Sequence, residues 1–439
     1  MEPKRILGVI AIVLGIMNIS KVYAEQPGDA NQCHDIWHRP TLTDGFFGLW
    51  EDNTFTNGFQ CFNDWLSQYG IEAELELTPV YQHNICGGKR TSDHTGRLSG
   101  SYEFGLTFDM DKIASIEGGE FFIAIEGGHT NGITDPAVGS FFPVLSSTYD
   151  CSIAVSEAFW NQYLFDKKLY LRVGKLDLKG KIKCHSRRVA FDGNVYAGEK
   201  KKQFFNKALY NNRSIPFPDN GLGAIALFNP SPGFYVAGGF ADAQANECET
   251  GFGTAFHREP YFVYMGEVGF MPDLLINENW LPGTYRFGVW YTHDEKTRYK
   301  DGSAQYDDAA FYLSFDQMLF KENDVKGDEQ GLGGFARYSF ADEEVNPVST
   351  FWSCGLQYQG LFQGRDNDVL GFGFAQGIFS DEAGSGFTDD SESLYEVYYE
   401  IKATRWLNIT LDIQYITDPG GIGMYDDALV LGARFHTHF

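Results

Sequence analysis

Five arginines, five carboxylates and one tryptophan have side chains suited to binding hydroxylated solutes. The planar guanidinium of arginine offers five N–H donors that can bridge neighbouring hydroxyl groups. Carboxylates accept hydrogen bonds from hydroxyls and offset the arginine charge, and an aromatic ring can stack on the apolar face of a pyranose. The candidates are Arg172, Arg286, Arg337, Arg365 and Arg405, the acidic partners Asp316, Asp366, Asp368, Glu396 and Glu400, and the aromatic Trp290.

A second interpretation stays open for each candidate, in which it is an ordinary wall residue, paired and solvated. The same choice applies to the run of lysines and arginines from Lys175 to Lys202, which reverses the sign of an acidic chain locally. This run is either a loop folded into a pore or an outer loop facing anionic lipid or water. We prefer the outer loop.

Motifs for catalysis, metal or cofactor binding have little support. The sequence contains no C-x-x-C, G-x-S-x-G or H-E-x-x-H. Asp366-x-Asp368 lacks the third carboxylate and the distant Glu of a calcium loop, so we interpret it as a turn. Gly371-x-Gly373 lies inside an alternating segment with no helix after it, and is no dinucleotide motif. We therefore expect neither cofactor nor metal, and no enzyme.

Two other classes of protein remain as alternatives. An outer-membrane lipase could be assembled from His293-Asp294 with Ser146 or Ser186, although no spacing requires it. The pair His436 and His438 is weak evidence for a metal. A secreted sugar-binding β-sandwich would share the strand pattern described next, but would not need this length of it.

Strands that alternate polar and apolar residues would position the candidate residues. Apolar side chains recur at every second place in four clear segments, which begin at Ile71, Tyr102, Leu169 and Tyr285. A strand points successive side chains to opposite faces, so each segment has one apolar and one polar face. Arg172 and Arg286 lie on polar faces.

Two environments produce this alternation, a soluble sandwich and a membrane barrel with a wet lumen. Aromatic residues beside strand ends, such as Tyr163, Tyr261, Tyr398 and Tyr399, favour the barrel, in which rings form girdles at the membrane interface. The polar, glycine-rich intervals 127–150, 179–203, 241–259 and 380–392 would be external loops.

The first 70 residues differ from the rest. Residues 1–24 combine a basic start, an apolar run of fourteen residues from Ile6 to Ile19 and a final Ala24, which indicates a secretory signal. Residues 25–70 are an N-terminal segment with a short helix, because Phe62, Trp65, Leu66 and Tyr69 form one helical face. Residues 71–439 form the strand-rich domain.

Charge and cysteine content narrow the partners and the compartment. A formal net charge of −25 makes nucleic acid an unsuitable partner. The cysteines are Cys33, Cys61, Cys86, Cys151, Cys184, Cys248 and Cys354. Six of them lie in polar or loop-like sequence, so we expect loop disulfides, with Cys354 free in an apolar strand.

The C-terminal segment favours the membrane barrel. Phe439, Thr437 and Phe435 share one face, and His438, His436 and Arg434 share the other. A last strand that ends in Phe resembles the closing strand of bacterial outer-membrane barrels. Thr437 departs from the apolar or aromatic residue usual at that place.

A family resemblance extends over most of residues 40–439 and is strongest in the last third. The matching stretches are Phe311–Gln317, Gly331–Arg337, Gly355–Tyr358, Arg365–Asp368, Gly371, Tyr395–Tyr399, Asp412–Ile416 and Pro419–Gly421. Upstream, Leu171–Asp177, Ile215–Pro218 and Pro282–Arg286 fit more loosely, and Leu42–Gly45 is a partial match. In their order and spacing these stretches resemble the carbohydrate-selective porins of the OprB family.

The resemblance implies a transmembrane antiparallel β-barrel of about sixteen strands in the bacterial outer membrane. It also implies passive diffusion of mono- and small oligosaccharides past weak contacts at a narrow point. Each chain would enclose its own lumen, and its outer face would contact membrane lipid. The chain would act alone or in a homotrimer. A general diffusion porin without sugar selectivity remains the alternative within the same fold.

Overall fold

The computed structural model describes residues 63–90, 95–129, 132–146, 151–179, 182–184, 187–197, 203–218, 220–246, 248, 260–323, 329–404 and 406–438. The side chains of His129 and of residues 183–188 are outside this description, as are Arg405 and the predicted signal segment. Within the described ranges, no helix has the length and apolar character needed to cross a membrane.

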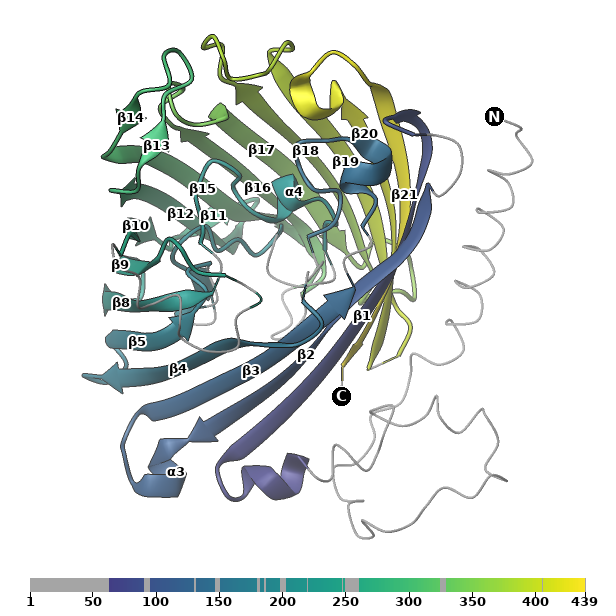
Figure 1. Cartoon of the computed structure of the whole chain (residues 1–439). Helices are drawn as coiled ribbons and strands as arrows, with labels where there is room; N and C mark the ends of the chain where they lie inside the picture. The colour runs from purple at the N-terminus through teal and green to yellow at the C-terminus, as the bar shows by residue number, and fades with distance from the viewer. Residues whose placement is uncertain are drawn as a thin grey trace.

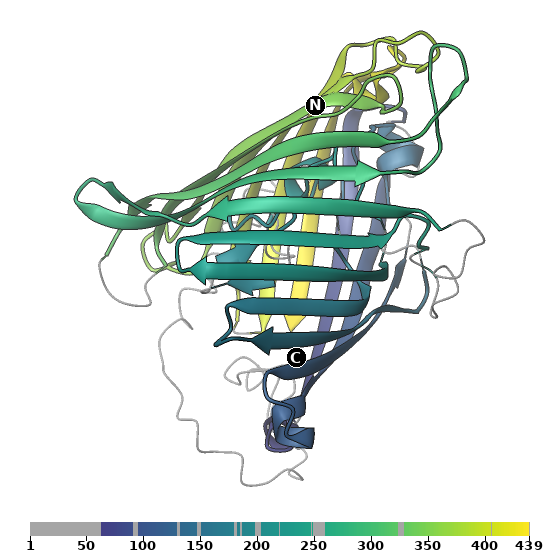
Figure 2. The same ribbon diagram turned by 90° about the vertical axis from the view of Figure 1, so that its left-hand side faces the viewer.

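The described strands form one antiparallel sheet that closes on itself. Each wall strand pairs with its neighbour in sequence, and β21 returns to pair with β1. The sixteen wall strands are β1 (Ile71–Gly88), β2 (Gly96–Asp109), β3 (Gly119–His129), β4 (Ala154–Leu164), β5 (Leu169–Leu176), β8 (Gly221–Ser231), β9 (Phe234–Asp242), β10 (Phe262–Phe270), β12 (Asn279–Thr292), β15 (Asp308–Lys321), β16 (Gly331–Phe340), β17 (Val348–Gln359), β18 (Val369–Phe379), β19 (Ser391–Lys402), β20 (Leu407–Thr417) and β21 (Asp426–His438). A short β11 (Asp273–Ile276) extends β12 as a hairpin. The predicted sixteen-stranded barrel is confirmed (Figures 1 and 2).

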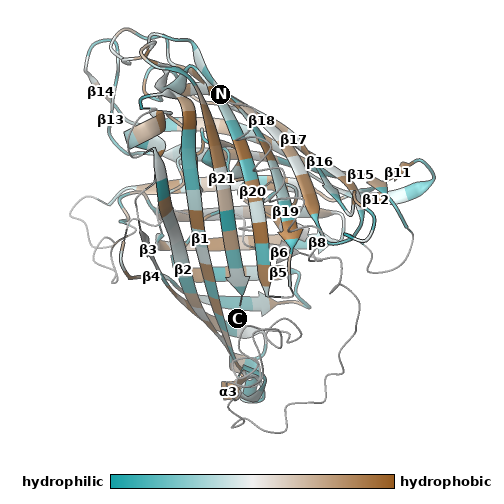
Figure 3. Cartoon of the chain, turned by 90° about the vertical axis from the view of Figure 1, so that its right-hand side faces the viewer, coloured by the Kyte–Doolittle hydropathy of each residue, from teal (hydrophilic) through white to brown (hydrophobic). Residues whose placement is uncertain are grey.

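The alternation of side chains separates a lumen face from an outer face. On β12, Arg286 and Trp290 are each 1% exposed, whereas Phe287 and Val289 between them are each 46% exposed. Apolar and polar residues alternate along the wall strands (Figure 3), and exposed apolar side chains such as Tyr264, Phe311 and Phe372 lie on the outer face. An outer face of this kind suits lipid, and the polar side chains are left for the interior.

The two ends of the barrel differ in the length of their connections. At the end that holds the C-terminus, the turns are short, as between β8 and β9 or β19 and β20. At the other end the connections are longer and carry β6 (Ile182–Cys184), β7 (Arg187–Val189), β13 (Lys296–Thr297), β14 (Ala304–Gln305), the short helix α4 (Lys207–Tyr210) and the helical turns Thr134–Val138 and Pro419–Gly421. Short turns face the periplasm in bacterial barrels, so the longer connections face outward from the cell.

A helical turn precedes the barrel, as the sequence predicts. It covers residues 63–67 and lies beside α3 (Met110–Ala114), since Lys112 Nζ donates to the Ser67 carbonyl over 3.2 Å. Trp65 and Tyr69 remain 44% and 59% exposed. The helix therefore does not bury its apolar face against the described wall.

The cysteines follow the prediction in part. Cys151 and Cys248 form a disulfide between two long connections, and Cys354 is free on β17. Cys86 is also free and lies on β1, so its assignment to a loop was wrong. Cys33, Cys61 and the side chain of Cys184 lie outside the described residues.

Candidate functional site

The connection between β5 and β8 turns into the barrel instead of leaving it. We call its described residues 187–197 and 203–218 the lumen loop. Phe191, Phe204, Phe205 and Leu209 of this loop are all 0% exposed. The helix α4 lies inside the ring of strands (Figure 1). The prediction of an external loop over 179–203 was wrong for residues 189–197, because Val189, Ala190, Phe191 and Ala197 are buried on the inner wall. The prediction for 127–150 fails similarly at Phe142 and Val144, which are buried against the same wall.

Glycines on the inner wall make room for the lumen loop. A Cβ at Gly373 would lie 2.7 Å from Leu209 and 2.8 Å from Phe204. A Cβ at Gly432 would lie 2.8 Å from Phe205. Such distances are below normal carbon contacts, so the loop can approach the wall only where the strands lack side chains.

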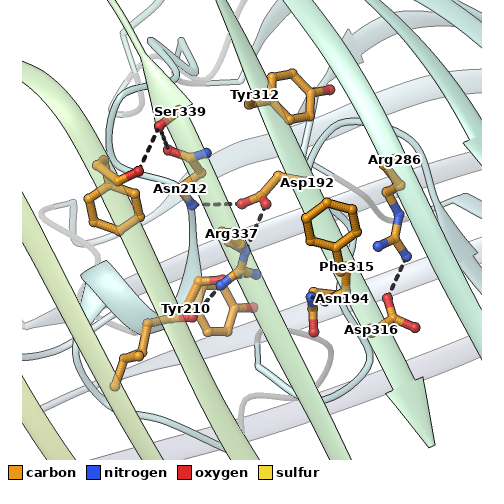
Figure 4. Close-up of polar contacts among 12 residues, drawn as sticks. Asp192, Asn194, Tyr210, Asn212, Arg286, Tyr312, Phe315, Asp316, Arg337 and Ser339 are labelled. Atoms are coloured by element: carbon orange, nitrogen blue, oxygen red, sulfur yellow. Dashed lines mark hydrogen bonds and ion pairs between the residues drawn. The ribbon is translucent and has the colours of Figure 1, made fainter.

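Arg337 joins the lumen loop to β16. Its Nε donates to Asp192 Oδ1 over 2.7 Å, and its Nη1 donates to the Leu209 carbonyl over 2.6 Å. Asp192 also accepts the Asn212 amide over 2.6 Å, and Ser339 donates to Asn212 (Figure 4). Burial raises the pKa of the Asp192 carboxyl, and the Arg337 guanidinium partly reverses that shift. The sequence indicated Arg337 but gave no signal for Asp192, which is 145 residues away.

Arg286 and Asp316 form a second buried pair on neighbouring strands. Arg286 Nη2 donates to Asp316 Oδ2 over 2.7 Å, and their side chains are 0% and 5% exposed (Figure 4). Nearby, Glu267 on β10 accepts hydroxyl hydrogen bonds from Tyr235 and Tyr312. Trp290 is on the inner face but only 1% exposed, inside the apolar cluster under the loop. These groups brace the wall and are closed to a passing solute.

Glu396 holds residues 205–206, in the middle of the lumen loop, against β19. Its two carboxylate oxygens accept the amides of Phe205 over 2.5 Å and Asn206 over 3.0 Å. Arg434 on β21 donates to the Gln203 carbonyl, and its guanidinium lies 4.3 Å from the centre of the Phe205 ring. Arg434 was missed as a candidate, although it shares the polar face of the last strand with His436 and His438.

The carboxylates on the inner face of β19 repeat every four residues. Glu392 accepts the amides of Phe141 and Phe142, so it holds a second inward segment near the outer mouth. Glu400 accepts from Asn408 on the neighbouring strand. This spacing was visible in the sequence, but the loops that it binds were not.

Arg172 lies on a different part of the wall. Its Nε donates to Tyr170 over 2.7 Å and to Asn161 over 3.0 Å, and its guanidinium lies 3.9 Å from the Phe159 ring centre. At 7% exposed it is less covered than Arg286 or Arg337.

Arg365, Asp366 and Asp368 lie away from the loop, in the turn between β17 and β18. Arg365 binds Asp368 with two hydrogen bonds of 2.7 and 2.6 Å, and Tyr399 donates to Asp368 over 2.7 Å. Asp366 is exposed. This turn closes the short-turn end of the wall, so we do not carry these residues into a constriction. Arg405 lies outside the described residues.

Part of the inner wall stays uncovered by the lumen loop. On β2 and β3 the inward-facing side chains Glu103, Glu120 and Glu126 are half-buried, whereas those of β16–β21 are largely closed over. The register aligns Glu76, Glu103 and Glu126 across three adjacent strands. Like charges directly opposite one another repel unless water or a partner screens them, and His436 and His438 lie 4.0 and 3.9 Å from Glu76. A row of half-buried carboxylates gives this strip a polar surface that suits a hydrated channel.

Comparisons with known proteins agree on one group. The family model described as "Carbohydrate-selective porin, OprB family" matches residues 93–439. Porin B of Pseudomonas aeruginosa is 24% identical over 85% of this chain and 88% of its own length. The putative porin QuiX of Acinetobacter baylyi is 22% identical over 85% of this chain and 90% of its own. The high-pH structure of Pseudomonas putida OprB superposes with a TM-score of 0.72 at 22% identity, covering 89% of this chain and 99% of that one.

Proposed function

The chain belongs to the carbohydrate-selective porin family, OprB, and from this premise we propose that the lumen loop sets the sugar-selective constriction of its pore. The protein is a channel of the bacterial outer membrane and not an enzyme. Sugars cross such a channel passively, so the residues need only fix a narrow polar passage and bind weakly.

The observation that carries the proposal is the attachment of the lumen loop to the wall. Asp192 and the Leu209 carbonyl bind Arg337, and Phe205 and Asn206 bind Glu396. Hydrogen bonds to charged groups are stronger than neutral ones, and these are shielded from water. A loop held in this way keeps the pore at one width. A pore that selects solutes by size requires a constant width.

The predicted eyelet residues divide into two roles in this proposal. Arg286, Asp316, Arg337, Glu396 and Glu400 are positioning residues, which brace the loop and the wall. Arg172 is the arginine that we expect to contact sugar, beside the half-buried carboxylates of β2 and β3. Donors and acceptors on the uncovered wall support recognition of the hydroxyl groups of a sugar, while the loop, whose apolar side chains are buried on the wall, sets the width of the passage.

The finer features of export and assembly are proposals as well. Residues 1–24 are proposed to be a cleaved signal, which N-terminal sequencing of the mature protein tests. Three barrels are proposed to associate in the membrane, and membrane lipid is proposed to surround them. Chemical cross-linking in outer-membrane vesicles tests the trimer. If only monomer bands appeared on the gel after cross-linking, the proposal of a trimer would be wrong.

Swelling of liposomes in isosmotic solute tests selectivity directly. The mature chain should admit glucose faster than an amino acid of similar size and much faster than a disaccharide. Equal rates for glucose and the amino acid would indicate the general diffusion porin. Absence of swelling, with the barrel shown to be folded by its heat-modifiable mobility on a gel, would contradict a channel altogether.

A further inference from the structure

A groove of about 480 Å³ crosses the outer face of the barrel where β21 meets β1 and β2. Its walls are almost wholly apolar, and Leu77, Pro79, Leu98, Gly100, Trp406 and Thr437 contribute to them. The lining includes no Asp, Glu, Lys, Arg or His among the described residues. The groove plays no part in the lumen network and requires its own explanation.

The sequence at the seam explains why the wall is hollow here. The β1–β21 ladder pairs Leu77 with Thr437 and resumes only at Val80, because Pro79 has no N–H to donate. Opposite Pro79 stands Gly100, whose φ of +144° and missing side chain let β2 approach closely. A Cβ there would lie 2.4 Å from the Thr78 carbonyl oxygen.

Thr437 is a second reason why the wall is hollow at this seam. Its outward side chain is short where closing strands usually carry an apolar or aromatic residue. The sequence shows this departure without explaining it, and the structure places it inside the groove.

We propose that this groove holds an acyl chain of a phospholipid in the periplasmic leaflet. The groove opens on the lipid-facing wall, since Leu77 and Leu98 in its lining are 37% and 67% exposed. It is continuous with exposed apolar side chains of the same strands, such as Tyr81 and Phe435. Trp406 stands at the short-turn end, where interfacial rings of membrane barrels gather. The uncharged lining excludes the headgroup, which must lie beyond the Trp406 end.

The dimensions fit an acyl chain. The register pairs Leu77 with Thr437 and Tyr81 with Leu98, so the groove rises over four residue steps of β1. At about 3.3 Å per residue this is roughly 13 Å along the wall. An apolar protein cavity of about 150 Å³ already binds benzene, so the groove has room for a longer hydrocarbon.

Native mass spectrometry of the detergent-solubilised mature chain, titrated with phosphatidylethanolamine, tests the proposal. Thr437→Phe fills the groove with the kind of residue that closing strands normally carry, so the barrel should still assemble. We expect it to weaken binding of the first lipid about tenfold, as expected for displacing roughly two methylenes from contact. Ala309→Phe, at an exposed site on β15 that is not part of the groove lining, is the matched control and should bind like the wild type.

A second variant keeps the test decisive if Thr437→Phe does not fold. Leu98→Asn places an amide against the acyl chain at an exposed position and should also weaken lipid binding. Equal lipid affinity in the folded groove variants and the control would overturn the proposal. So would loss of an oligomer with lipid binding unchanged, since the groove would then seat a second copy of the chain. Sugar-driven swelling should be unaffected in all these variants, which separates this proposal from the function of the lumen loop.

Discussion

At the scale of single residues, the lumen is organised by charges that bind backbone. Arg337 and Glu396 lie on different strands, yet each holds main-chain groups of the same loop. Backbone groups of a loop must find partners when water is excluded. Charged wall residues supply these partners without requiring a particular side chain from the loop.

Replacement of Arg337 by alanine should loosen the lumen loop. The change leaves Asp192 buried without its cation, and breaking a buried pair typically costs about 3–5 kcal/mol. We expect the ratio of disaccharide to glucose swelling rates to rise severalfold as the loop moves from the wall. Adding Asp192→Asn should restore part of the lost stability, since it removes the stranded charge.

The pair Arg365–Asp368 provides the control for Arg337. It is also a buried arginine–aspartate pair, but it lies in the turn between β17 and β18. Arg365→Ala should lower the thermal midpoint and leave the swelling ratio unchanged. If both variants changed the ratio equally, the effect would belong to general destabilisation and not to the loop.

Glu396→Gln should act on the middle of the loop, between the two loop residues that Arg337 binds. Glutamine has one acceptor oxygen in place of two, so one of the amides of Phe205 and Asn206 loses its partner. Single-channel recordings should show larger current fluctuations than those of the wild type. Glu400→Gln, on the same face of β19, removes a bond to Asn408 within the wall and should leave the current quiet. A quiet Glu396→Gln channel would mean that the loop does not depend on this carboxylate.

At the scale of elements, the long connections are fixed to each other as well as to the wall. The Cys151–Cys248 disulfide joins the segment before β4 to the segment between β9 and β10, across 97 residues of chain. It thereby spans the strands that lead into and out of the lumen loop. Cross-linking so long a segment restricts the unfolded chain strongly.

Reduction of this disulfide should lower stability while leaving permeation intact. Chain entropy alone suggests roughly 4–5 kcal/mol for a closed loop of this length. We expect a lower thermal midpoint for Cys151→Ser with Cys248→Ser, and an unchanged swelling ratio because the lumen contacts remain. Cys354→Ser removes a free thiol on β17 and should be neutral. An unchanged midpoint in the double variant would show that the bond does not constrain unfolding.

The strands were predictable because their signal is local. The alternating segments at Tyr102, Leu169 and Tyr285 became β2, β5 and β12, and the C-terminal pattern became β21. Which face is polar depends only on every second residue, so neighbours in sequence carry the information. Trp290 lies on the inner face, as the alternation indicates, but in the apolar cluster under the loop and not at an open lumen surface.

The path of the lumen loop was not predictable for the opposite reason. Polar and glycine-rich sequence suggested an outer loop, and the apolar residues Phe191, Phe204 and Leu209 were too scattered to form a periodic pattern. Their partners lie far away in sequence, as do Asp192 and Arg337 at a separation of 145 residues. Patterns in a single sequence predict which face of a strand is polar. The burial of a loop depends instead on contacts with the closed wall around it, which such patterns do not contain.

At the scale of the whole molecule, the barrel wall and the lumen loop are structurally independent parts. The ladder from β1 round to β21 pairs every wall strand with two neighbours and includes no residue of the lumen loop. The closed ladder satisfies the backbone of the wall by itself, which is the condition for spanning a membrane. We therefore expect selectivity for sugars to depend on the lumen loop and the uncovered wall, and stability to depend mostly on the wall.

Removal of the lumen loop should therefore convert the selective channel into a wide one. We expect a chain in which residues 187–216 are replaced by a short glycine–serine linker to retain heat-modifiable mobility and strand-rich circular dichroism. The arginines and carboxylates that the loop now covers, Arg286, Arg337, Arg434 and Glu396, would face water in the open lumen instead of a dry interior. The cost of burying unpaired charge is then avoided, since hydrated charges need no protein partner. Swelling in trisaccharide should rise from near zero to a rate comparable with glucose, and the amino acid should lose its disadvantage. If the deleted form folded and still rejected the trisaccharide, the narrow point would lie elsewhere, with the segment held by Glu392 at the outer mouth as the next candidate.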